Sequence, residues 1–344
     1  MNKRVSVGIA GLGRSGWNIH ADTLAGLDDI FELRAVCDND HARRTEAIER
    51  FGCSAYSDFG ELVADPNVEL VVVSTPTHLH SRFSIDALRA GKHVLVEKPM
   101  AEDVTKADQM IAVARESDRV LTVFQSRRFE ADVQKILEVI ESGVLGRIVE
   151  VRTDRLSFAR RWDWQTMKQF HGGLLNNNGA HIVDQALLFF DDPEPDVFCR
   201  MESTELYAGD AESYLKVVLI PKGGPIVEVN STNGFAFPQN RWMVMGTHGS
   251  LIGDPTKVSW KYFDPNELEP MTLDPGPAPD RKYSREELPW REESWTIVED
   301  KKNYERIYRS IYGAIRDGTP ALVTPESVRR QILVLDKCRS LSPV

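Results

Sequence analysis

A glycine-rich turn near the N-terminus is the first place where residue types and spacing indicate chemistry. Residues 11–16 read Gly-Leu-Gly-Arg-Ser-Gly, a GxGxxG pattern that directly follows an apolar run and opens a helical pattern. In such a turn the first glycine allows a tight bend, the second lets backbone N–H groups approach a pyrophosphate, and the third lets helix and strand pack. The helix N-terminus then faces the phosphates. The predicted dinucleotide contacts are Gly11, Gly13, Arg14, Ser15 and Gly16.

An acidic residue further along supports dinucleotide binding. Asp38 ends the second predicted strand, 22 residues after Gly16. A carboxylate there accepts hydrogen bonds from ribose hydroxyls and repels a 2′-phosphate, which favours NAD over NADP. Arg43 and Arg44 follow closely and can reach a 2′-phosphate if Asp38 turns away, so NADP stays open.

Two more turns lie where parallel strands are expected to end. Glu97-Lys98-Pro99 closes one predicted strand, and residues 74–80 (Ser-Thr-Pro-Thr-His-Leu-His) follow another. Ligands of open α/β sheets sit beyond the carboxyl ends of the strands, so Lys98 is expected to project toward the cofactor. His78 and His80 are two residues apart and would not share a helix face, so no metal site is predicted. The further predicted cofactor contacts are Ser74, Thr75, Pro76, His80, Glu97 and Lys98.

The first third of the chain alternates short apolar runs with longer amphipathic stretches. Asp103 is a plausible N-cap and Gly91 a helix stop. Strands are expected at 5–10, 33–37, 70–74, 93–97 and 120–124, and helices at roughly 14–27, 40–51, 58–65, 80–90 and 103–117. Near-continuous apolar strands alternating with helices predict a doubly wound parallel sheet, a Rossmann fold, over residues 1–125.

The pattern changes after residue 125. Helices are expected at about 129–142 and 179–190, and strands at about 147–157, 197–206, 213–220, 225–231, 241–246 and 258–263. Strands that follow one another without helices predict an α+β domain with a large, mainly antiparallel sheet over residues 126–344. Residues 264–300 are expected to form a solvated excursion, with a lid as the alternative. The helical segment 303–344 is expected to pack back onto the body.

Taken in order, these motifs resemble the Gfo/Idh/MocA oxidoreductase family, which includes glucose–fructose oxidoreductase and inositol dehydrogenase. The resemblance continues through residues 125–129 (Gln-Ser-Arg-Arg-Phe), 172–184 (Gly-Gly to His-Ile-Val-Asp) and 318–326, and covers nearly the whole chain. It implies reversible NAD(P)-dependent hydride transfer to or from a hydroxyl of a sugar, inositol or related polyol. It also implies a homodimer or homotetramer formed through the C-terminal sheet.

The resemblance further implies that Lys98 and a histidine of the second domain, His181, meet at the nicotinamide. The family pattern GG-x3-D-x-G-x-H-x2-D has an aspartate where this chain has Asn177, which can orient a hydroxyl but cannot act as a base. A histidine titrating near neutral pH can take the hydroxyl proton, while a lysine stabilises the developing alkoxide. Asn177 and His181 are four apart and share a face if helical.

Substrate contacts are expected from side chains that grip polyols through guanidinium forks, carboxylates and aromatic faces. The candidates are Arg127, Arg128, Trp162, Asp163, Trp164 and Asp184. Two other functions stay open: reduction of another small carbonyl or unsaturated compound, and a non-catalytic nucleotide or sugar sensor. Lys98 and His181 together weigh against the sensor, whereas Asn177 favours it.

The composition argues against several other classes of protein. The chain has 344 residues, 42% hydrophobic and 27% charged, which is ordinary for a globular protein of about two domains. Its net charge of −10 disfavours nucleic acid and anionic membranes as partners. No apolar stretch has the length of a bilayer span. The four cysteines form no CxxC pair, which suits a reducing compartment and makes the cytoplasm the expected location.

Overall fold

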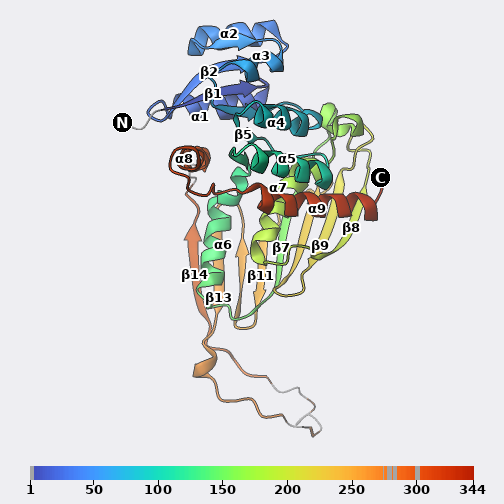
Figure 1. Cartoon of the computed structure of the whole chain (residues 1–344). Coiled ribbons are helices and arrows are strands. Elements are labelled where there is room, and N and C mark those ends of the chain that lie inside the picture. The colour runs from blue at the N-terminus through green and yellow to red at the C-terminus, as the bar shows by residue number, and fades with distance from the viewer. Residues whose placement is uncertain (1–3, 274, 277–280, 282–284, 299–302) are drawn as a thin grey trace.

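Two β-sheets organise the chain, one built from its first third and one from residues beyond 147 (Figure 1). The structure is a computed structural model that describes residues 4–273, 275–276, 281, 285–298 and 303–344.

The N-terminal sheet has six parallel strands in the order β3-β2-β1-β4-β5-β6. The strands are β1 (Val5–Ala10), β2 (Phe31–Cys37), β3 (Ser54–Tyr56), β4 (Leu70–Val73), β5 (His93–Val96) and β6 (Leu121–Val123). This confirms the predicted doubly wound sheet. The sequence did not predict β3, because three partly exposed residues produce no apolar run. The strand order reverses between β1 and β4, and ligands of such sheets bind at that point.

Helices cover both faces of this sheet near the predicted positions. They are the π-helix η1 (Gly16–Ala21), α1 (Asp22–Ala25), α2 (His41–Phe51), α3 (Phe59–Ala64), the short 3₁₀ helix η2 (Thr77–Leu79), α4 (His80–Arg89) and α5 (Val104–Glu116). The predicted N-cap Asp103 is confirmed, because its side chain accepts a hydrogen bond from the Lys106 amide at 2.8 Å.

The second sheet has eight strands in the order β14-β13-β12-β11-β7-β10-β9-β8. They are β7 (Ile148–Leu156), β8 (Asp196–Glu202), β9 (Tyr214–Ile220), β10 (Ile226–Thr232), β11 (Trp242–Gly246), β12 (Gly249–Gly253), β13 (Lys257–Tyr262) and β14 (Arg291–Thr296). All neighbours pair antiparallel except β7 and β10, which are parallel. The mainly antiparallel sheet is therefore confirmed.

The helices of this half lie largely on one face of the second sheet (Figure 1). They are η3 (Ser126–Phe129), α6 (Ala131–Glu141), η4 (Trp164–Thr166), η5 (Lys168–Phe170), the π-helix η6 (Leu175–Gly179), α7 (Ala180–Ala186) and η7 (Leu187–Phe189), followed later by η8 (Pro265–Glu267), α8 (Asn303–Arg316) and α9 (Pro325–Leu341).

Two strands of the second sheet were not predicted. β12 is bounded by a glycine at each end, which indicates a turn from sequence. β14 pairs with β13 at the sheet edge with most of its side chains exposed, so it lacks apolar alternation. The prediction of a solvated excursion is therefore wrong for 291–296. Residues 274, 277–280, 282–284 and 299–300 of that predicted segment lie outside the described residues.

The C-terminal helices join the two halves, as the packing of their apolar side chains shows. On α8, Ile307, Tyr308 and Ile311 pack into the core of the N-terminal sheet. On α9, Ile332 belongs to the N-terminal core and Leu335 to the core of the second sheet. These contacts fix the turns of one half against the helices of the other. None of the helices in the described part of the chain is both long and apolar enough to cross a bilayer.

Candidate active site

A cleft of about 1310 Å³ runs past the carboxyl ends of the N-terminal strands and reaches the second half of the chain. One wall comprises the glycine turn, residues 74–80 and residues 97–99. The opposite wall comprises residues 163–165, 171–173 and 176–177. The cleft therefore lies where the strand order reverses, and both halves of the chain line it.

The glycine turn fits a dinucleotide for reasons visible in the backbone. A Cβ on Gly16 would lie 1.9 Å from Gly11 O, and one on Gly11, whose φ is +91°, would lie 2.8 Å from Ser74 O. Internal packing therefore requires both glycines. A Cβ on Gly13 would meet nothing within 4 Å among the described residues, so no contact within the protein requires a glycine there. Gly13 lines the cleft, and its bare backbone is open to a pyrophosphate.

Asp38 lies at the end of β2 and lines the cleft. Its Oδ2 accepts a hydrogen bond from the Leu12 amide at 2.7 Å and its Oδ1 accepts one from the Asp40 amide at 2.9 Å. The carboxylate thus holds the glycine turn against β2 and keeps lone pairs that can accept ribose hydroxyls. Arg43 Nη1 lies 3.5 Å from Asp38 Oδ2, whereas Arg44 Nη1 donates to Asp38 O at 2.7 Å.

The other predicted cofactor contacts also line the cleft, and two of them brace its turns. His80 Nε2 lies 2.8 Å from Thr75 O and its Nδ1 lies 2.8 Å from Pro99 O, so its ring links residues 74–80 to the lysine turn. Ser74 Oγ donates to Gly11 O at 2.8 Å. The two turns and the glycine turn therefore form one connected wall.

Lys98 reaches across the cleft to the other half of the chain. Its Nζ donates to Asn177 O, in η6, at 3.2 Å. Burial lowers the pKa of Lys98 to about 8; the Glu97 carboxylate opposes this shift, while Arg127 and Arg14 add to it. A buried amine with one neutral hydrogen-bond acceptor can donate its remaining protons to a ligand oxygen.

Two buried side chains that the sequence did not indicate, His20 and Tyr308, hold the Glu97 carboxylate through hydrogen bonds. His20 Nε2 lies 3.3 Å from Glu97 Oε1, and His20 Nδ1 lies 2.9 Å from the Tyr308 hydroxyl. Glu97 Oε2 accepts from the Lys98 amide at 3.0 Å. Helix α8 therefore contributes to positioning the lysine turn. Tyr308 of this helix and His20 are 288 residues apart, so no local sequence pattern indicates this contact.

His181 lies on α7 and is 9% exposed. Among the described residues its Nδ1 has no hydrogen-bond partner. Burial lowers the pKa of His181 well below its usual value, and the positive charges of Lys98 and three arginines lower it further. The direction of this shift contradicts the expectation of titration near neutral pH and favours the neutral imidazole, the form that can accept a proton.

Of the six predicted substrate contacts, Asp163 and Trp164 line the cleft, and the other four do not. Asp163 and Trp164 line the cleft beside Asn177, whose Nδ2 donates to Gln165 Oε1 at 3.2 Å. Trp162, by contrast, is 82% exposed and lies outside the lining.

Arg128 and Asp184 pair with each other instead of lining the cleft. Arg128 Nε and Nη2 donate to the two oxygens of Asp184 at 2.7 and 2.6 Å. Arg128 Nη1 also donates to Ser327 Oγ at 2.8 Å. This bidentate, buried pair ties η3 to α7 and α9. Arg127, the neighbouring residue, has a side chain that is 32% exposed and lies close enough to Lys98 to lower its pKa.

Known proteins resemble this chain in both of its halves. Residues 5–125 match the family described as oxidoreductase family, NAD-binding Rossmann fold, and residues 133–269 match the GFO/IDH/MocA C-terminal domain. The myo-inositol 2-dehydrogenase of Thermotoga maritima is 31% identical over 254 residues, 72% of this chain and 75% of that protein. The scyllo-inositol 2-dehydrogenase (NADP(+)) of Bacillus subtilis is 27% identical over 358 residues, 96% of this chain and 92% of that protein.

A solved structure shows the same fold. An NAD-binding protein from Listeria innocua superposes with a TM-score of 0.82 at 21% identity, covering 99% of this chain and 97% of that one. The two domain matches and the extent of the relationship to the Thermotoga protein establish the family. The chain belongs to the Gfo/Idh/MocA family of NAD-binding oxidoreductases.

Proposed function

We propose that this protein transfers a hydride reversibly between NAD and a hydroxyl-bearing carbon of a sugar, inositol or related polyol, with Lys98 and His181 managing the proton. The observation that supports it most is the Lys98 Nζ–Asn177 O contact of 3.2 Å. It joins the lysine turn to the segment that leads directly into α7 and His181. The inositol substrates in the names of two relatives favour a polyol.

In this proposal the residues that line the cleft share the work with His181, which lies on α7 outside the lining. The glycine turn, Asp38 and residues 74–76 would hold the cofactor, which supplies the hydride chemistry when bound. Neutral His181 accepts the hydroxyl proton. The Lys98 ammonium donates a hydrogen bond to the same oxygen and stabilises its developing negative charge. Asn177 orients the hydroxyl and leaves proton transfer to its neighbours.

We propose NAD as the preferred cofactor, because the Asp38 carboxylate faces the position of the adenosine ribose and repels a 2′-phosphate. NADP stays an alternative for a specific reason. The side chain of Arg43 is 49% exposed beside Asp38, and one relative is named as an NADP(+) enzyme.

In this proposal residues 1–125 bind the cofactor, and residues 126–344 bind the substrate and mediate self-association.

We propose a homodimer or homotetramer formed through the face of the second sheet opposite α6 and α7. Phe198, Met243, Met245 and Ile252 on that sheet are each 44–54% exposed. A second copy would cover them. The four cysteines are free and buried, which suits the proposed cytoplasmic location.

The proposal is tested by following absorbance at the NADH band with purified protein, NAD and a panel of polyols. Lys98→Ala and His181→Ala should each lower kcat by about 10²- to 10⁴-fold. Lys106→Ala, which removes a lysine paired with Glu102 on the surface of α5, is the control and should keep wild-type turnover. Wild-type rates in both site variants would refute the assignment. Tight NAD binding with no turnover of any compound would favour the sensor instead.

A further inference from the structure

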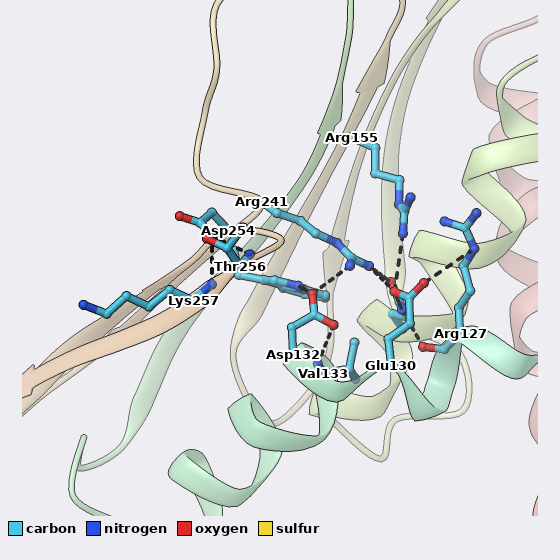
Figure 2. Close-up of polar contacts among 11 residues, drawn as sticks. Arg127, Glu130, Asp132, Val133, Arg155, Arg241, Asp254, Thr256 and Lys257 are labelled. Carbon is cyan, nitrogen blue, oxygen red and sulfur yellow. Dashed lines mark hydrogen bonds and ion pairs between the residues drawn. The ribbon is translucent and has the colours of Figure 1, made fainter. Parts of the chain in front are cut away.

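Three arginines and two carboxylates gather beside α7, and Figure 2 shows their side chains converging. We call this group the arginine cluster: Arg127, Arg155, Arg241, Glu130 and Asp132. Arg241 donates to Asp132 Oδ2 at 2.7 Å and to Glu130 Oε2 at 2.6 Å. Arg155 Nη2 lies 3.4 Å from Glu130 Oε2, and Arg127 Nε lies 3.7 Å from Glu130 Oε1. Sequence reasoning singled out only Arg127 of these five.

The arginine cluster lies next to the proposed base. Gln185 Nε2 donates to Arg127 O at 2.6 Å, and Gln185 Oε1 accepts from Arg241 Nη2 at 3.0 Å. Gln185 follows His181 by four residues on α7, so the two share one helix face about 6 Å apart along the axis. The cluster therefore begins one helical turn from His181. The same arginines are among the charges that lower the pKa of His181.

The charges in the cluster do not balance. Three guanidinium groups share two carboxylates, and Asp132 also accepts from Trp242 Nε1 and the Val133 amide, both at 2.9 Å. Arg127 Nη1, Arg155 Nε and Arg241 Nε are buried with no hydrogen-bond partner in the described part of the chain. Burial and the two neighbouring arginines lower the pKa of Arg155 to about 9. Three guanidinium groups with two carboxylates leave one positive charge in excess, so this arrangement favours one further anion.

Two arginines of the cluster are partly exposed. The side chains of Arg127 and Arg155 are 32% and 24% exposed, so neither is sealed in the core. The positive charge of Arg127 lowers the pKa of Lys98, and Arg14 contributes to the lowered pKa of both Lys98 and Arg127. None of the five residues of the cluster lines the cleft, and the charge of Arg127 links the cluster to Lys98.

We propose that Arg127 and Arg155 bind a carboxylate of the substrate, so that this protein acts on a sugar acid in preference to a neutral polyol. The inference rests on the proposed function and names its substrate class. One carboxylate matches the single excess positive charge, and guanidinium forks bind carboxylates with two parallel hydrogen bonds. A phosphate dianion would exceed that charge.

The test compares sugars that differ only at one carbon: D-glucose with D-glucuronate, and D-galactose with D-galacturonate. With NAD and the wild-type protein, kcat/KM should be at least about tenfold higher for the acid of a pair. Arg155→Gln should bring that ratio near one. Arg115→Gln is the matched control, because Arg115 is a surface arginine paired with Glu326, and it should keep the wild-type ratio.

A binding measurement separates this inference from the proposed reaction. In the presence of NAD, the uronate should raise the Tm of the wild-type protein more than its neutral partner does, and Arg155→Gln should lose that difference. Without ligand, Arg155→Gln should have a Tm no lower than wild type, because it removes a poorly compensated charge. A purely structural cluster predicts a lower Tm in Arg155→Gln and no uronate effect.

The outcomes are distinguishable. Equal kcat/KM for acid and neutral sugar, with no extra Tm shift from the acid, overturns the sugar-acid inference and leaves polyol oxidation standing. Arg155-dependent stabilisation by a uronate without turnover supports the anion site and refutes the proposed reaction. Stronger stabilisation by D-glucose 6-phosphate than by D-glucuronate overturns the choice of a carboxylate.

Discussion

Replacing Lys98 with methionine should stabilise the protein at neutral pH while abolishing its activity. The partly buried amine of Lys98 donates a hydrogen bond to Asn177 O at 3.2 Å, and burial lowers its pKa from 10.5 to about 8. Methionine has a similar length and no charge. A lysine kept for packing would show the opposite behaviour, so stability and activity together identify a residue kept for chemistry.

The magnitude follows from the shift in pKa. One pKa unit corresponds to about 1.4 kcal/mol, so the charge of Lys98 costs the folded state at most about 3 kcal/mol at pH 7, less after solvent screening. Because the folded pKa is lower than the unfolded pKa, the cost is complete below about pH 8 and shrinks as the pH rises toward 10.5. We expect Lys98→Met to gain about 2–3 kcal/mol at pH 7 and less than about 1 kcal/mol at pH 10.

The assay is urea unfolding of wild type and Lys98→Met at pH 7 and pH 10 without cofactor, alongside NADH-band turnover. Other alkaline titrations cancel in the difference between the two proteins. Lys92→Met is the matched control. Lys92 is also buried, but its Nζ donates to Asp65 O at 2.7 Å and to Val68 O at 2.8 Å.

The control should move in the opposite direction. Lys92→Met leaves two carbonyls of the N-terminal half without their donor, which should destabilise the protein by about 1–3 kcal/mol at pH 7. The reasoning is refuted if Lys98→Met is destabilised at pH 7, or if its stability relative to wild type does not depend on pH.

Three further predictions concern the cofactor turn and the proposed base. Gly16→Ala should lower Tm and abolish NAD binding, since its Cβ would lie 1.9 Å from Gly11 O. Gly13→Ala, whose Cβ would meet none of the described residues within 4 Å, should keep Tm and weaken NAD binding measured by calorimetry; equal effects of the two substitutions would contradict the pyrophosphate contact proposed for Gly13. Asp38→Ala should raise KM for NAD far more than KM for NADP, and an unchanged ratio would remove Asp38 from the site. Since the pKa of His181 lies well below 6.5, kcat/KM should stay level as the pH falls through 6.5; a decline centred there would show that His181 titrates normally.

The N-terminal half was predictable because its signals are local. The apolar runs that became β1, β4 and β5 are buried strands, and GxGxxG lies in the turn that its spacing predicts. Boundaries moved by a few residues at most for these strands. The weaker strands β3, β12 and β14 were missed because short length, flanking glycines or exposed charges hide the period-two pattern.

The site was predictable only in part, because several of its contacts join residues far apart in the sequence. The motifs named Lys98 and Asn177, but no pattern shows that an amine and a carbonyl 79 residues apart would meet. The hydrogen bond of Tyr308 was likewise not predictable, because in sequence Tyr308 is one of several regularly spaced apolar residues of a helix. Arg155 did leave a signal: it continues the alternation of Val151 and Thr153, which places a charge on the buried face of β7.

A crystal structure of the protein with bound NAD would show whether Lys98 and His181 meet at the nicotinamide. We expect the nicotinamide ring to lie between Lys98 and His181, with the Lys98 amine and the His181 imidazole both facing a space large enough for a small hydroxy compound. A ring bound elsewhere, or the two side chains pointing apart with protein atoms between them, would contradict it.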